Sequence, residues 1–107
     1  MVRFLAILHK RADVSPEEFV RYWKEVHAPI VMKMPGIRRF RENIVRSCRV
    51  PGIEPFAIGE LWFDSEEAGL AALKSEEGKK ALASGGNIIN QERNAGIAVE
   101  EIADFRE

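Results

Sequence analysis

The fold is decided by a stretch that runs from Ser15 to Gly36 and reads SPEEFVRYWKEVHAPIVMKMPG. Its start is typical of a helix, because Ser15 can cap the first turn, Pro16 suits the first helical position and Glu18 completes an S-x-x-E capping box. Its end is marked by Pro35 and Gly36, since glycine readily adopts the left-handed conformation that closes many helices. The stretch therefore predicts a helix that stops at this pair.

One face of the predicted helix is apolar and also carries a histidine. The apolar positions recur at helical spacing and are Phe19, Tyr22, Trp23, Val26 and Ile30. His27 lies four residues after Trp23 and so points to a neighbouring position on that face. Pro29 removes a backbone donor and crowds the carbonyl of Glu25, so we expect the helix to kink or break there. A histidine beside a disturbed turn is the main functional lead in the sequence.

Four strands and further helices surround this stretch. The predicted strands are Val2–His9, Ile37–Cys48, Phe56–Phe63 and Gly96–Ile102. Further helices are expected to begin at Asp64 or Ser65 and again after Ser75. With right-handed crossovers, the order strand, helix, strand, strand, helix, strand gives a four-stranded antiparallel sheet with both helical regions on one face. This is an α+β, ferredoxin-like βαββαβ fold, and residues 1–107 are expected to form a single domain.

The first predicted strand is apolar on both sides. Phe4, Ala6 and Leu8 share one side, while Leu5 and Ile7 share the other. Because helices cover only one face of such a sheet, the open face is predicted to meet a second copy of the chain. The sequence thus predicts a homodimer.

Composition indicates which classes of partner and which cellular compartment to expect. The formal net charge of −1 predicts no attraction to nucleic acid or to an anionic membrane. Cys48 is the only cysteine, which excludes a disulfide within the chain and is typical of a reducing compartment. The start, MVRFLAILHK, lacks the features of a signal peptide, and no apolar run approaches the roughly 20 residues of a membrane span. We expect a cytoplasmic protein with no nucleic-acid or membrane partner.

Three motifs resemble the EthD family, whose name comes from ethyl tert-butyl ether degradation. They are W-x-x-x-H-x-P from Trp23 to Pro29, M-P-G-I from Met34 to Ile37 and E-L-W-F-D-S from Glu60 to Ser65. The resemblance implies a dimeric α+β barrel, in which two ferredoxin-like sheets pack face to face. The chain departs from the family at positions 87–90, where N-I-I-N stands in place of an aromatic residue and an aspartate. Relatives in this superfamily catalyse several unrelated reactions, so the resemblance specifies the fold rather than the chemistry.

His27 is the first candidate catalytic residue. A neutral imidazole in a partly apolar pocket can exchange a proton with a carbon or phenol that a carbonyl has made acidic. The competing interpretation is a packed, hydrogen-bonded histidine of the core. Glu60 is its candidate catalytic companion, because a carboxylate on a largely apolar strand face needs a partner. Alternatively, that face meets the dimer partner and Glu60 binds an arginine such as Arg39.

Five further residues are candidate substrate-binding residues, namely Tyr22, Trp23, Trp62, Arg39 and Asn43. The aromatic three are suited to a cleft for a flat or apolar ligand between helix and sheet, although each also fits an ordinary core. Arg39 and Asn43 are suited to holding a developing oxyanion, or else face solvent or the dimer partner. His9 is expected at the surface.

Three functions remain open from the sequence. The first is a cofactor-independent enzyme of isomerase, decarboxylase or monooxygenase type, which acts on a small apolar or aromatic carbonyl compound through His27. The second is a non-catalytic protein of the same fold that binds a small molecule. The third is a haem-binding protein, because a lone histidine can be an axial ligand. No metal site is predicted, since two histidines without a matching cluster do not make one, and the glycine signatures of nucleotide sites are missing.

Overall fold

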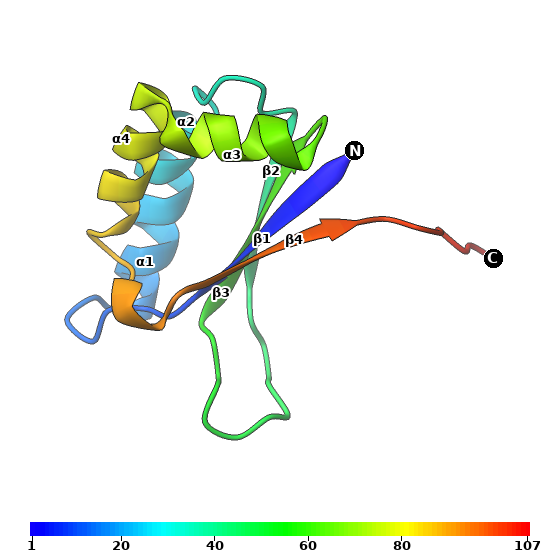
Figure 1. Ribbon diagram of the computed structural model, residues 1–107. Helices are drawn as coiled ribbons and strands as arrows, with labels where there is room; N and C mark the ends of the chain where they lie inside the picture. The colour runs from blue at the N-terminus through cyan, green and yellow to red at the C-terminus, as the bar shows by residue number, and fades with distance from the viewer.

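Helices cover one face of a four-stranded antiparallel sheet in the computed structural model, which describes residues 1–107 (Figure 1). The spatial order of the strands is β2-β3-β1-β4, as a ferredoxin-like fold requires. The strands are β1 (Val2–Leu8), β2 (Arg39–Ile44), β3 (Ala57–Phe63) and β4 (Ala95–Glu100). The helices are α1 (Pro16–Tyr22), the π-helical segment η1 (Trp23–His27), α2 (Ala28–Val31), α3 (Glu66–Lys74), α4 (Glu76–Gly85) and the short 3-10 turn η2 (Gln91–Arg93).

The register of the sheet decides which side chains face the helices. In β1 and β3, Phe4 pairs with Leu61 and Ala6 pairs with Gly59. A Cβ built on Gly59 would lie 3.6 Å from the ring of Trp23, so this set of residues faces the helices. The alternate residues point to the opposite, open face of the sheet, and they include Arg3, Leu5, Ile7, Arg39, Arg41, Asn43, Ile58, Glu60, Trp62 and Ile97. The predicted ferredoxin-like fold with a four-stranded antiparallel sheet is confirmed.

The predicted strand ends are displaced by a few residues. The strand predicted at Ile37–Cys48 is shortened to Arg39–Ile44, and the strand predicted to reach Ile102 ends at Glu100. A long loop joins β2 to β3 and extends beyond the edge of the layers, while the C-terminal segment runs away from the body of the molecule (Figure 1). These two segments carry the turn residues and charges that shorten the strands.

The helix that starts at Ser15 does not break at Pro29. The Ser15 side chain accepts a hydrogen bond from the amide of Glu18, as the capping box predicts. Ahead of the proline, the amide of Ala28 donates to the carbonyl of Trp23, which is the i→i+5 bond of a π turn. A single turn of the helix is therefore wider just before Pro29, and the helix continues to Val31. The predicted disturbance takes the form of this wide turn, and the dihedrals of Trp23, His27 and Ala28 stay in the helical region.

Aromatic side chains fill the space between the layers. Phe19, Trp23 and Phe63 are the largest fully buried side chains, and the rings of Phe19 and Trp23 lie 5.3 Å apart. After α2, Gly36 has a φ of 80°, which is the left-handed conformation expected at this helix ending. The helix itself stops earlier than predicted, at Val31, and turns occupy the residues between.

Close contact between α3 and α4 depends on one glycine. A Cβ built on Gly78 would lie 2.2 Å from the carbonyl oxygen of Ala72, at the end of α3. Ser75 caps α4 here by accepting a hydrogen bond from the amide of Gly78. Only glycine lets α4 begin so close to α3, which places the rest of α4 over the sheet.

Candidate functional site

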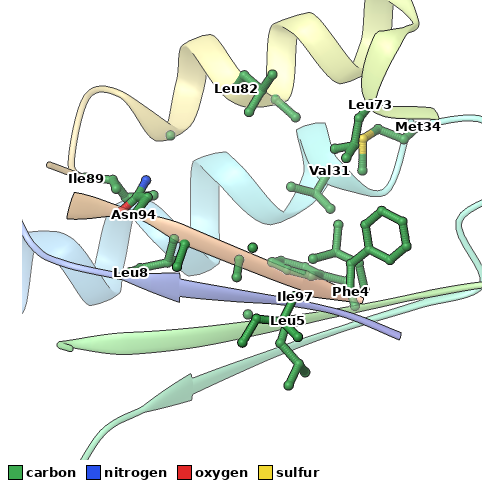
Figure 2. A pocket seen from close by; sticks show the side chains of 18 of the residues that line it. Phe4, Leu5, Leu8, Val31, Met34, Leu73, Leu82, Ile89, Asn94 and Ile97 are labelled. Atoms are coloured by element: carbon green, nitrogen blue, oxygen red, sulfur yellow. The ribbon is translucent and has the colours of Figure 1, made fainter. Parts of the chain in front are cut away.

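A cavity of about 500 Å³ lies between the helices and the sheet. Most of the residues that line it are apolar and come from β1, β4, α2, α3 and α4. In Figure 2, Phe4 rises from the sheet into this space, while Val31 and Leu82 approach from the helices. Its volume and lining are typical of a pocket for a small, largely apolar molecule.

The cavity opens to solvent beside β4. Leu82 of α4 is 56% exposed, although it lines the cavity. Leu70 of α3 lines it too and is also exposed. Apolar side chains thus border the mouth, and the exposed Glu66 is the only acidic residue of the lining.

Few polar groups reach the cavity. Asn94 and Gln91 contribute amides, and Asn94 lies beside Ile89 at one end (Figure 2). Among the lining residues only His27 and Glu66 are ionisable, and none is lysine or arginine. Burying an ion in such surroundings is costly, so the lining favours an uncharged ligand.

His27 is the polar residue most deeply placed in the lining. It is 8% exposed, and burial lowers its pKa from 6.5 to about 4. The imidazole is therefore neutral at neutral pH. Its Nδ1 atom lies 3.1 Å from the hydroxyl oxygen of Ser84, whereas its Nε2 atom makes no hydrogen bond within the protein. One ring nitrogen remains free for a ligand.

Ser84 connects His27 to the protein surface. The hydroxyl oxygen of Ser84 also lies 3.1 Å from that of Tyr22, and the Tyr22 oxygen accepts a hydrogen bond of 2.8 Å from the exposed amide of Asn87. The four side chains form a hydrogen-bonded chain from the cavity to solvent. We call this chain, made of His27, Ser84, Tyr22 and Asn87, the relay.

The π turn explains how both Tyr22 and His27 reach Ser84. Residues five apart point about 140° away from each other on an ordinary α-helix. The wider turn of η1, closed by the bond from Ala28 to Trp23, brings positions five apart back toward one side. π turns inside α-helices are frequent at functional sites for such reasons.

Of the predicted binding residues, only Trp23 lines the cavity. It is almost fully buried, and its ring meets that of Phe40 edge-on at a centroid distance of 6.4 Å. Tyr22 does not line the cavity and instead belongs to the relay.

Glu60 and His27 lie on opposite faces of the sheet and do not form the pair considered from the sequence. Glu60 accepts hydrogen bonds from Arg3 at 3.2 Å and from Asn43 at 3.0 Å. Arg41 approaches it at 3.9 Å. Glu60 thus has arginine partners, although they are not the predicted Arg39, and Asn43 is held by Glu60 away from the cavity. The cause is the register, since neighbours of Gly59 in β3 must point away from the helices.

Trp62 is also on the open face and shares no cleft with Trp23. The guanidinium carbons of Arg39, Arg41 and Arg3 lie 5.0, 5.3 and 5.4 Å from the centre of its ring. These are cation–π distances. Arg39 therefore packs on Trp62 and not against anything inside the cavity.

Sequence reasoning missed Ser84, Asn87 and Glu42. Ser84 follows Ala81 by three residues and so shares the buried side of α4, and a buried hydroxyl needs a partner. The need for a partner could be read from the sequence, but the identity of that partner could not.

Glu42 faces the helix side of β2, where one carboxylate oxygen is buried without a hydrogen bond. Burial raises the pKa of Glu42 to about 7. His9, expected at the surface, is half-buried, and both of its ring nitrogens are covered.

No three His, Cys, Asp or Glu side chains come together in a group that could hold a metal ion. Every helix is too short or too polar to cross a membrane.

Comparison with known proteins places the chain among small α+β proteins. Residues 11–91 match the family model described as the EthD domain. The chain is also 28% identical over 90 residues to an uncharacterized 11.0 kDa protein of the thcB-thcC intergenic region of Rhodococcus erythropolis, and the match covers 84% of this chain and 85% of that protein.

Solved structures share the whole fold. An EthD family protein from Bacillus halodurans has a TM-score of 0.77 at 20% identity, covering 95% of this chain and 99% of that one. A dimeric protein of unknown function and ferredoxin-like fold from Bacteroides fragilis has a TM-score of 0.68 at 18% identity, covering 94% and 95%. SnoaB, a cofactor-independent oxygenase from Streptomyces nogalater, has a TM-score of 0.72 at 13% identity, covering 99% and 97%. At these identities the likeness shows the fold alone.

Proposed function

This chain belongs to the EthD family, and we propose that it acts without a bound cofactor on a small apolar or aromatic carbonyl compound. The compound occupies the cavity between the helices and the sheet, and His27 exchanges a proton or a hydrogen bond with it. The reaction is of the isomerase, decarboxylase or monooxygenase type. The description of SnoaB as a cofactor-independent oxygenase supports chemistry of this kind on this fold.

One observation carries the proposal, namely that His27 is neutral and has a free ring nitrogen in an apolar cavity. In a site of low polarity, a hydrogen bond to a carbonyl oxygen is stronger than in water. Negative charge that develops on this oxygen when a neighbouring carbon loses a proton, or loses its carboxylate group as carbon dioxide, is then stabilised. The apolar lining selects the body of the compound, and His27 selects its functional group.

Hydrogen exchange tests this proposal before the natural substrate is known. β-Tetralone is a suitable probe, because it carries acidic protons on the carbon between its aromatic ring and its carbonyl. In deuterium oxide, the wild-type protein is expected to accelerate the loss of these proton signals over buffer, and His27→Ala is expected to remove the acceleration. Exchange no faster than in buffer, or full acceleration by a folded His27→Ala protein, contradicts the proposal.

Binding without turnover is the second candidate function. The low pKa of His27, about 4, favours it, because a group so weakly basic is a poor general base near neutral pH. A shift in melting temperature with β-tetralone, together with no accelerated exchange, would support this role.

Haem fits the cavity less well. Nε2 of His27 is free to bind iron, but no lysine or arginine lines the cavity to pair with the propionates. Addition of haem to the purified protein is expected to give no shifted Soret band, and a clear shift would restore this candidate.

We also propose that two copies pair through the open face of the sheet. The dimeric ferredoxin-like protein from Bacteroides fragilis supports this arrangement, as do the apolar side chains of Leu5, Ile58 and Ile97 on that face. Sedimentation should show a dimer that Ile58→Lys dissociates. Val26→Lys, at an exposed apolar position of the helix layer, is the matched control and should leave the dimer intact.

A further inference from the structure

The direction of hydrogen bonding along the relay can be followed from its outer end. The side-chain amide of Asn87 donates to the oxygen of Tyr22 at 2.8 Å. That oxygen therefore acts as an acceptor, and its own hydrogen remains to be donated. The hydroxyl oxygen of Ser84, at 3.1 Å, is its partner within the protein.

Hydrogen-bond donation continues in the same direction from Ser84 to His27. Ser84 is 7% exposed, and the side chains of Tyr22 and His27 are its hydroxyl's partners. If Ser84 accepts from Tyr22, its single hydrogen must go to Nδ1 of His27. Nδ1 then accepts and carries no proton, so the one proton of the neutral imidazole is on Nε2.

If hydrogen bonds were donated in the reverse direction, from His27 outward, one hydrogen of the relay would lack an acceptor. If Nδ1 of His27 donated to Ser84, then Ser84 would donate to Tyr22. The Tyr22 oxygen would receive two donors, one from Asn87 and one from Ser84, and its own hydrogen would have no acceptor in the protein. A polar hydrogen without an acceptor costs free energy when it is partly buried.

We infer that Asn87, Tyr22 and Ser84 hold His27 as the Nε2–H tautomer, so that the cavity presents a hydrogen-bond donor and recognises a neutral oxygen acceptor on an apolar body. Ketones, quinones and esters have this chemistry, whereas ligands that can only donate do not. Unlike both nitrogens of His9, Nε2 of His27 is not sealed within the protein, and it belongs to a residue that lines the cavity.

This inference rests on the proposed function for the identity of the site and sharpens the role of His27 there. As an Nε2–H donor, His27 stabilises negative charge on the carbonyl oxygen and is not the base that takes the proton from carbon. That proton passes to water at the open mouth. Ser84, Tyr22 and Asn87 act through His27 and are positioning residues.

Nitrogen-15 NMR of the ligand-free protein tests the tautomer directly. The chain has two histidines, so a His9→Gln variant assigns the signals of His27. Long-range proton–nitrogen correlations distinguish a protonated from an unprotonated ring nitrogen. We expect Nε2 to be protonated and Nδ1 unprotonated at neutral pH, and a protonated Nδ1 overturns the inference.

An isosteric change at the surface tests the role of the relay. Asn87→Asp replaces the donor to Tyr22 by an acceptor, so Tyr22 should donate outward, Ser84 should donate to Tyr22, and Nδ1 should become the protonated nitrogen. Asn90→Asp is the matched control, because it adds the same charge three residues away and keeps the oxygen that accepts from the amide of Glu92. The control should retain the wild-type tautomer. An Asn87→Asp protein with the wild-type tautomer contradicts the relay.

A matched pair of ligands tests recognition. β-Acetonaphthone and β-ethylnaphthalene have similar shapes, but only the ketone accepts a hydrogen bond. The wild-type protein should prefer the ketone by roughly threefold to tenfold, and Asn87→Asp should lose the preference. Equal affinity of the wild-type protein for the two compounds overturns the proposed recognition. If neither compound binds, the proposed function fails, while the NMR result still decides the tautomer.

Discussion

The backbone of Gly85 packs against the imidazole of His27. A Cβ built on Gly85 would lie 3.5 Å from Cε1 of His27 and 3.3 Å from Cδ1 of Ile89. A methyl group therefore fits after a small shift, but a longer side chain must enter the cavity beside the imidazole. This contact offers a way to block the site without altering His27.

We predict that Gly85→Leu weakens the binding of β-acetonaphthone by about tenfold or more, because the added side chain occupies the space next to Nε2. Gly85→Ala should bind almost as well as the wild type. Ala83→Leu, at an exposed position of α4, is the control for general effects on the helix. Titration followed by tryptophan fluorescence gives the affinities, and unchanged binding by a folded Gly85→Leu protein would place the ligand elsewhere.

Gly78 is predicted to be far less tolerant of substitution than Gly96. In Gly78→Ala the new Cβ would meet the backbone carbonyl of Ala72 at 2.2 Å, and backbone cannot move aside without separating α4 from α3. We expect a loss of about 3 kcal/mol or more in the free energy of unfolding, at the upper end of overpacking effects. Gly96→Ala has open space around its Cβ and should change stability by less than about 0.5 kcal/mol. Urea denaturation of both variants tests the difference.

Burial of His27 makes the protein less stable in acid. Its pKa falls from 6.5 to about 4 on folding, so between these values the unfolded chain binds a proton that the folded protein does not. Stability therefore rises with pH across this interval and is lowest below it. The expected contribution is about 3 kcal/mol. Unfolding measured from pH 4 to 7 should show a steeper rise for the wild type than for His27→Gln, and parallel curves would contradict the burial of a neutral imidazole.

Glu42 is predicted to act in the opposite direction. Burial raises its pKa from 4.5 to about 7, so over this interval the folded protein keeps a proton that the unfolded chain has lost. Stability contributed by Glu42 thus falls as pH rises. Because the side chain is only half-buried and Lys24 partly offsets the effect, we expect about 1–2 kcal/mol. Glu42→Gln should be more stable than the wild type at pH 8 and similar to it at pH 4. A variant that is less stable at pH 8 would show that the carboxylate has a partner.

The fold could be predicted because its signals are local. The capping box at Ser15 and the caps at Ser65 and Ser75 each mark the start of a helix, and all three side chains accept the expected amide hydrogen bond. The alternation of side chains along β3 correctly predicted that Gly59 and Glu60 lie on opposite faces of the sheet. The order of elements then left few possible topologies.

The site was harder to predict because it depends on contacts between distant segments. Both sides of β3 are rich in apolar residues, so alternation alone did not show which side the helices cover. From the sequence, Glu60 and Trp62 are therefore candidates for the cavity, although they lie on the open face. The bonds of Ser84 to Tyr22 and His27 join segments about sixty residues apart, and no local pattern specifies them. His27 could be predicted because a local feature, the proline two residues later, marks its turn of the helix.

Because η1 is a wide turn, the number of residues in this helix does not by itself decide which way its side chains point. Five residues of π turn bring His27 to the side that four residues of α-helix would reach. Loss of one exposed residue, such as Lys24 or Glu25, would convert the segment to an ordinary helix and still leave the histidine on the side of Tyr22. In alignments of this family, a gap of one residue inside this motif is therefore compatible with an unchanged site, whereas the identity of the residue facing Ser84 is not.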